Sequence, residues 1–105
     1  MYNISQISID EAKESLDAGE TVFVDIRDPD SYQAAHIPGA VNLNNENVHD
    51  FLEQTDKTQP IIVYCYHGNS SLNGSAFFME QGFETVHSMI GGFHAWCTLY
   101  PHTTD

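Results

Sequence analysis

The chain has 105 residues and a mass of 11.8 kDa, which predicts a single domain over residues 1–105, since folded domains are typically about 100 to 150 residues long. Hydrophobic residues make up 41% of the sequence, which fits a globular protein and excludes a disordered tail. Three basic residues against fifteen acidic ones give a net charge of −12, which argues against nucleic acid or an anionic membrane surface as a partner, because both require clustered Lys and Arg.

Short apolar, β-branched runs start at intervals of roughly twenty residues, the length of a strand plus a crossover helix. The predicted strands are 22–26, 40–43, 61–65 and 85–87, with a short first strand at 4–5. The unbroken apolar character of 61–65 favours a strand that is buried on both faces, as in a parallel sheet.

Segments with helical periodicity fill the gaps between these runs. Ser8 and Glu11 form a capping box for a helix that ends at Gly19, and Asp28-Pro29 favours the start of a short helix through residue 35. Three more helices are predicted: one around 48–55, one capped by Ser70 or Ser71 and ended by Gly82, and one from Gly92 to Tyr100. This alternation predicts an α/β fold, a parallel sheet of four to five strands flanked by helices on both faces.

The two cysteines, Cys65 and Cys97, form neither a CxxC motif nor a disulfide framework. Together with an N-terminus that lacks a basic and apolar leader, they predict a cytoplasmic protein. No apolar stretch reaches 18 residues, so no membrane span is expected. The six histidines show no metal-ligand spacing, and we expect neither a metal nor another cofactor.

Cys65 ends the most buried predicted strand and is followed by a loop of small and turn-favouring residues. These are Tyr66, His67, Gly68, Asn69, Ser70 and Ser71. A helix that begins near Ser71 would direct its N-terminus and several backbone N–H groups at the sulfur, which would lower the thiol pKa from about 8.5 toward neutrality. Because the thiolate is the nucleophile, Cys65 is predicted to be reactive. Cys97 has no such loop and lies on an apolar helix stripe, so it is interpreted as structural.

Three stretches in this order resemble the rhodanese family, the thiosulfate sulfurtransferases. The first combines Asp-Ile-Arg-Asp at 25–28, Tyr32, and His-Ile-Pro-Gly-Ala at 36–40. The second is the loop Cys-Tyr-His-Gly-Asn-Ser-Ser at 65–71, which is most similar to single-domain bacterial members, and the third is Gly-Gly-Phe-His-Ala-Trp at 91–96. Together they span most of the chain, and the resemblance implies a rhodanese-like fold.

The resemblance also implies a two-step transfer of sulfur. The Cys65 thiolate would attack the outer sulfur of thiosulfate, release sulfite and retain a persulfide. Cyanide, a cellular thiol, or a dithiol protein such as thioredoxin would then accept the sulfur, with ping-pong kinetics. By the same resemblance the backbone of 66–70 surrounds the persulfide, and the hydroxyl of Ser70 or Ser71 adds a donor.

Residues outside the loop are interpreted mainly as its support. Asp25 and Arg27 are expected to form a structural ion pair near the loop. His67 is expected to line the substrate entrance, since an ionised thiol needs no general base. Gly91 and Gly92 are expected to let the final helix pack closely beside the loop.

Leu72 departs from the family pattern, because related enzymes can carry a lysine or arginine just after the loop. No lysine or arginine follows Lys57 in this chain. Thiosulfate is a dianion, so a protein with a charge of −12 should attract it weakly. The sequence therefore leaves open whether the donor is thiosulfate or another compound such as a persulfide.

Two other functions fit parts of the pattern. A cysteine-dependent phosphatase also holds a thiolate at a helix N-terminus, but it needs an arginine six positions after the cysteine, where this chain has Ser71. A non-catalytic rhodanese-like interaction module would keep the fold, but such modules typically lack the cysteine that this chain retains.

Overall fold

A computed structural model describes residues 4–103 of the chain. The strands are β1 (Ser5–Ile7), β2 (Val22–Asp25), β3 (Val41–Asn42), β4 (Ile61–Tyr64) and β5 (Val86–Met89). The helices are α1 (Ile9–Ala18), α2 (Pro29–Ala34), α3 (Val48–Gln54), α4 (Ser70–Glu80) and α5 (Gly92–Leu99). Strands and helices alternate throughout this part of the chain, as the sequence predicts.

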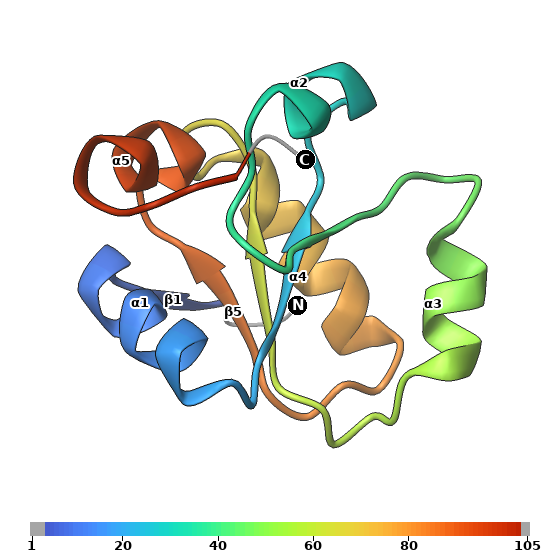
Figure 1. Cartoon of the computed structure of the whole chain (residues 1–105). Coiled ribbons are helices and arrows are strands. Elements are labelled where there is room, and N and C mark those ends of the chain that lie inside the picture. Colours follow the sequence, from blue (N-terminus) through green and yellow to red (C-terminus); the bar gives the residue numbers. More distant parts are fainter. Residues whose placement is uncertain (1–3, 104–105) are drawn as a thin grey trace.

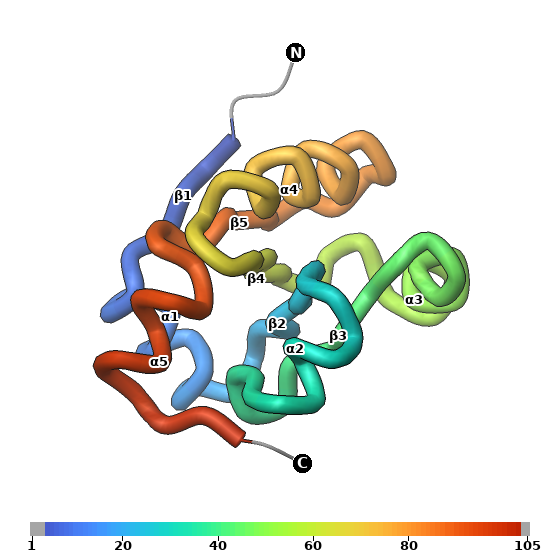
Figure 2. The backbone as a smooth tube through the Cα atoms, turned by 90° about the horizontal axis from the view of Figure 1, so that it is seen from above, coloured from blue at the N-terminus to red at the C-terminus, as the bar shows by residue number. Residues whose placement is uncertain are grey.

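The five strands form one parallel sheet in the order β1-β5-β4-β2-β3 (Figure 1). Strand β4 lies at its centre, and all four of its residues are buried. Helices α1 and α5 cover one face, and α3 and α4 cover the other (Figure 2). The predicted α/β fold is therefore confirmed. Because all strands run in one direction, their carboxyl ends meet at one edge of the sheet, where ligands bind in such folds.

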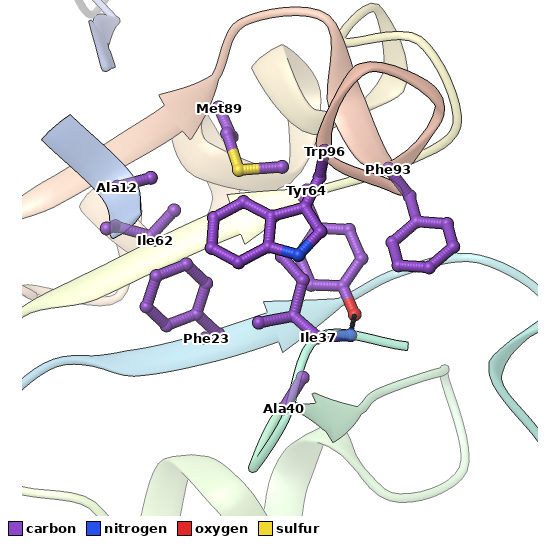
Figure 3. Packing of buried hydrophobic residues seen from close by; sticks show 9 residues of the cluster. All are labelled: Ala12, Phe23, Ile37, Ala40, Ile62, Tyr64, Met89, Phe93 and Trp96. Atoms are coloured by element: carbon purple, nitrogen blue, oxygen red, sulfur yellow. Dashed lines mark hydrogen bonds between the residues drawn. The ribbon is translucent and has the colours of Figure 1, made fainter. Parts of the chain in front are cut away.

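Each face of the sheet carries its own hydrophobic cluster. On the α1 and α5 face, Trp96, Tyr64 and Phe23 are the largest buried side chains, and the Ile37 N–H donates to the Tyr64 hydroxyl oxygen over 3.2 Å (Figure 3). On the other face, Phe78 is packed against residues of β2, β4, β5 and α3. Each such burial contributes about 1.5–3 kcal/mol, so the two clusters fix both layers of helices on the sheet.

Most predicted helix starts are confirmed in atomic detail. The Glu11 N–H donates to the Ser8 hydroxyl over 3.1 Å, and the Glu11 carboxylate accepts from the Ser8 N–H, which completes the capping box. Asp28 caps α2 by accepting from the Ser31 N–H over 3.0 Å. These caps satisfy backbone donors that have no partner within the helix.

The structure corrects the start of α4 and several strand ends. Asn69 is the N-cap of α4 and makes no side-chain cap bond, so neither Ser70 nor Ser71 caps the helix. Ser70 is instead its first residue, and the Ser71 hydroxyl contacts Ser88. Strand β1 covers Ser5–Ile7 rather than 4–5, and β5 covers Val86–Met89 rather than 85–87. Strands β2 and β4 each end one residue earlier than predicted, so Cys65 follows β4 instead of ending it, and β3 is only two residues long. Within residues 4–103, no helix is both long and apolar enough to cross a membrane.

Candidate active site at the carboxyl end of β4

Cys65 follows β4 directly, at the sheet edge where the strands end. Its Sγ accepts hydrogen bonds from the backbone N–H groups of Gly68 and Ser71, both at 3.2 Å. Cys65 is 4% exposed, whereas Tyr66, His67, Asn69 and Ser70 above it are exposed. The sulfur therefore lies just beneath a thin exposed loop and receives two of the backbone donors that the sequence predicts.

These donors change the acidity of the thiol. Burial alone raises the pKa of Cys65, but hydrogen bonds from the Ser71 hydroxyl and from the N–H groups of Ser71, Gly68 and His67 lower it by more. The pKa of Cys65 therefore lies below the ordinary thiol value. Since each of these donors favours the charged form of the sulfur, the loop stabilises a thiolate without any cationic side chain.

The first turn of α5 holds the cysteine loop in place. The Phe93 N–H donates to the Cys65 carbonyl over 2.8 Å, and the His94 N–H donates to the Tyr66 carbonyl over 3.0 Å. This contact requires Gly92, because a Cβ there would lie 2.5 Å from the Tyr66 oxygen and 2.7 Å from the Cys65 oxygen. Gly92 permits the close packing of α5 beside the loop, as the sequence predicts.

A buried ion pair supports the loop from β2. The Arg27 guanidinium binds the Asp25 carboxylate at 2.7 Å and donates to the Ala35 carbonyl over 2.6 Å. It also lies 4.2 Å from the centroid of the Phe93 ring and 5.7 Å from that of Tyr66. Arg27 thus fulfils the predicted structural role, joining β2, the segment after α2 and the two elements that frame Cys65.

Few positive charges are available at the loop. Lys13 is paired with Asp17, and Lys57 lies over the Phe83 ring, so neither is a free cation beside Cys65. Leu72 is half-buried in the first turn of α4.

His67 is exposed on the loop, with its ring centroid 5.1 Å from that of His94 on α5. Sequence reasoning did not single out His94, although it lies in the third family-like stretch.

Ser88 is the other residue that the sequence analysis missed. Its hydroxyl lies 2.7 Å from the Ser71 hydroxyl, and both residues are buried. The sequence could have indicated Ser88, because it directly follows the predicted strand 85–87 and lies two positions after Val86, on the same face as that core residue.

The described residues contain no group of three or more His, Cys, Asp or Glu side chains that could hold a metal ion. The chemistry that this arrangement offers is that of a sulfur nucleophile.

The fold and the cysteine loop define a class of protein. Residues 8–99 match the family described as "Rhodanese-like domain", and the chain belongs to that family.

Curated relatives match almost the whole chain. A protein named thiosulfate sulfurtransferase GlpE from Pseudoalteromonas translucida is 51% identical over 99 residues, which cover 94% of each chain. A protein of the same name from Pseudomonas syringae is 40% identical over 104 residues, covering 99% of this chain and 97% of the relative. Among solved structures, a rhodanese-related protein from Thermoplasma volcanium has a TM-score of 0.82 at 20% identity, covering 96% of this chain and 99% of that one. The resemblance seen in the sequence, to a single-domain rhodanese, is confirmed.

Proposed function

We propose that the protein is a thiosulfate sulfurtransferase that carries the transferred sulfur as a persulfide on Cys65. The activity follows from family membership and from the two relatives of that name, which match over nearly the full chain. The observation that carries the assignment to Cys65 is the pair of backbone N–H groups that point at its sulfur. The substrate-binding role of Tyr66, His67, Gly68, Asn69, Ser70 and Ser71 is part of the same proposal.

In the first step the Cys65 thiolate attacks the outer sulfur of thiosulfate. A new sulfur–sulfur bond forms, the bond between the two thiosulfate sulfurs breaks, and sulfite leaves with its electron pair. Cys65 is left as an anionic persulfide, so total charge is conserved. The loop N–H groups stabilise negative charge on sulfur both before and after the transfer, and they need no reorganisation to do so.

In the second step a nucleophilic acceptor takes the outer sulfur. Cyanide attacks it, the persulfide bond breaks, and thiocyanate and the Cys65 thiolate are formed. A thiol acceptor forms its own persulfide in the same way. In a dithiol protein such as thioredoxin, the second thiolate can then attack the inner persulfide sulfur, close a disulfide and release the outer sulfur as hydrosulfide. Because the enzyme alternates between two covalent states, the kinetics should be ping-pong.

The proposal is tested by incubating the protein with thiosulfate and recording its intact mass. We expect the mass to increase by one sulfur atom and to return to its original value when cyanide is added, with one thiocyanate formed per sulfur lost. A protein that gains no sulfur from thiosulfate or from a persulfide donor is not a sulfurtransferase.

The lowered pKa of Cys65 predicts how the first step depends on pH. The rate of sulfur loading should be constant above the pKa of Cys65 and should fall about tenfold per pH unit below it, because only the thiolate attacks. The acidic limb should lie below the midpoint of an unperturbed cysteine, about pH 8.5. Stability should change in the same direction, since the contribution of a lowered pKa is lost as the pH falls through it. Single-turnover loading measured across the pH range checks this, and a midpoint at or above that of a free thiol would contradict it.

Leu72→Lys should lower the KM for thiosulfate several-fold, with kcat nearly unchanged. Residue 72 is in the first turn of α4, close to the cysteine loop, where a cation would attract a dianion. Leu72→Gln is the control, because it adds polarity without charge. The difference between the two variants should shrink at high ionic strength. Equal KM values for the two variants at low salt would show that the missing cation does not limit affinity.

The alternatives have specific weaknesses. A phosphatase would need a guanidinium at the position of Ser71, and Arg27 is already bound to Asp25 and to the Ala35 carbonyl. A non-catalytic module has no use for N–H groups directed at a thiol. A cytoplasmic location remains a prediction from the sequence.

A further inference from the structure

Ser88 occupies a position in β5 where an apolar side chain would be expected. Strand residues alternate between faces, so Ser88 shares its face with Val86, which packs in the cluster formed with α4. Ser88 is 1% exposed. A buried hydroxyl is unfavourable unless it is hydrogen-bonded. Ser88 can therefore be placed here only because its hydroxyl has a hydrogen-bond partner.

That partner is Ser71, the residue that binds the Cys65 sulfur. The two hydroxyl oxygens are 2.7 Å apart, and Ser71 is 0% exposed. The backbone N–H of Ser71 donates to the Cys65 sulfur over 3.2 Å, so this one residue contacts both Ser88 and the sulfur. The Ser71 hydroxyl is also among the groups that lower the pKa of Cys65. Either hydroxyl can donate in the contact between the two serines.

We propose that Ser88 is a positioning residue for the Cys65 sulfur: its hydrogen bond to the Ser71 hydroxyl fixes the first turn of α4 against β5 and thereby holds the Ser71 N–H at the sulfur. The result is a buried relay from β5 through α4 to the sulfur. The relay secures the position of one of the two N–H groups that bind the sulfur. The effect of Ser88 on sulfur transfer rests on the proposed function, in which Cys65 is the nucleophile.

Ser75 provides a matched comparison for Ser88. It lies one helical turn after Ser71 in α4 and is 0% exposed, but its hydroxyl has no hydrogen-bond partner. Ser75→Ala removes a buried hydroxyl near the sheet without touching the relay. It therefore measures what the loss of a buried oxygen does through packing alone.

The test measures alkylation of Cys65 by iodoacetamide as a function of pH, in a Cys97→Ser background so that a single thiol reacts. Alkylation needs no sulfur donor, so its outcome is independent of whether the protein transfers sulfur. We expect Ser88→Ala to slow alkylation about threefold below the thiol pKa, the scale of one hydrogen bond, and to leave the plateau rate at high pH unchanged. Ser75→Ala should superimpose on the parent.

Two further variants separate positioning from packing. Ser88→Thr retains the hydroxyl and should restore the parent profile. In a Ser71→Ala background, Ser88→Ala should have no additional effect, because Ser88 acts only through Ser71. The ionisable groups around the loop are the same in every variant. They are His67, His94, the Tyr66 hydroxyl with the Asp28 carboxylate that it binds, and the Asp25–Arg27 pair. The proposal is overturned if Ser88→Ala matches the parent profile, or if its effect persists without the Ser71 hydroxyl.

Discussion

Cys65→Ser should abolish sulfur loading and reduce sulfur transfer to cyanide by at least about 10³-fold. The serine hydroxyl has nearly the same size as the thiol but is not ionised near neutral pH, so no nucleophile is present to attack thiosulfate. The loop that holds the sulfur should persist, because its carbonyls are bound by the backbone of α5 rather than by the thiol. Intact mass after thiosulfate treatment and the rate of thiocyanate formation measure the two effects.

Cys97→Ser is the matched control for this prediction. Cys97 is a half-buried thiol on α5 whose nearest polar contact is the His94 carbonyl, 3.4 Å from its sulfur. No backbone N–H is directed at it as Gly68 and Ser71 are directed at Cys65. The Cys97→Ser protein should therefore gain one sulfur, as the parent does. If the Cys65→Ser protein were still loaded while Cys97→Ser was not, the sulfur carrier would be Cys97 and the assignment of the site would be wrong.

The parts of the fold that were predicted correctly follow mostly from sequence patterns a few residues long. The capping box at Ser8, the Asp28 cap and the apolar run at 61–65 each act over a few residues, and each is found where it was expected. One prediction that failed, a serine cap on α4, also concerned a local signal. Ser71 is used instead in a contact with β5, seventeen residues away in sequence, which no local pattern could indicate.

In the candidate site too, features set by neighbouring residues were predicted, and some features set by the packing of distant segments were not. The nucleophile and its loop are contiguous, so the sequence predicts them together with the N–H groups that face the sulfur. Two contacts between elements were not predicted, because the pairing of His67 with His94 and that of Ser71 with Ser88 depend on how α5 and β5 lie against the loop. Arg27 is intermediate, because its pair with Asp25 spans two residues, while its contact with Phe93 requires the folded sheet.

Gly92→Ala should disrupt the cysteine loop, with a loss of several kcal/mol in stability and at least about tenfold in sulfur transfer. Gly92 has φ of +61°, a conformation that costs an L-residue roughly 1–2 kcal/mol. The added Cβ would also lie 2.5 Å from the Tyr66 carbonyl oxygen, so α5 and the loop would have to separate. Separation would break the hydrogen bonds from Phe93 and His94 that hold the loop carbonyls. The free energy of unfolding and kcat/KM measure the two effects.

Gly19→Ala separates the two causes. Gly19 has a similar φ of +76° at the end of α1, but a Cβ there would meet nothing within 4 Å, so this variant carries the backbone cost without the clash. We expect it to lose about 1–2 kcal/mol and to transfer sulfur at the parent rate. Equal losses of stability in both variants, with sulfur transfer retained in Gly92→Ala, would mean that the loop tolerates a displaced α5. The position of the N–H groups at Cys65 would then depend on the loop sequence alone rather than on its packing against that helix.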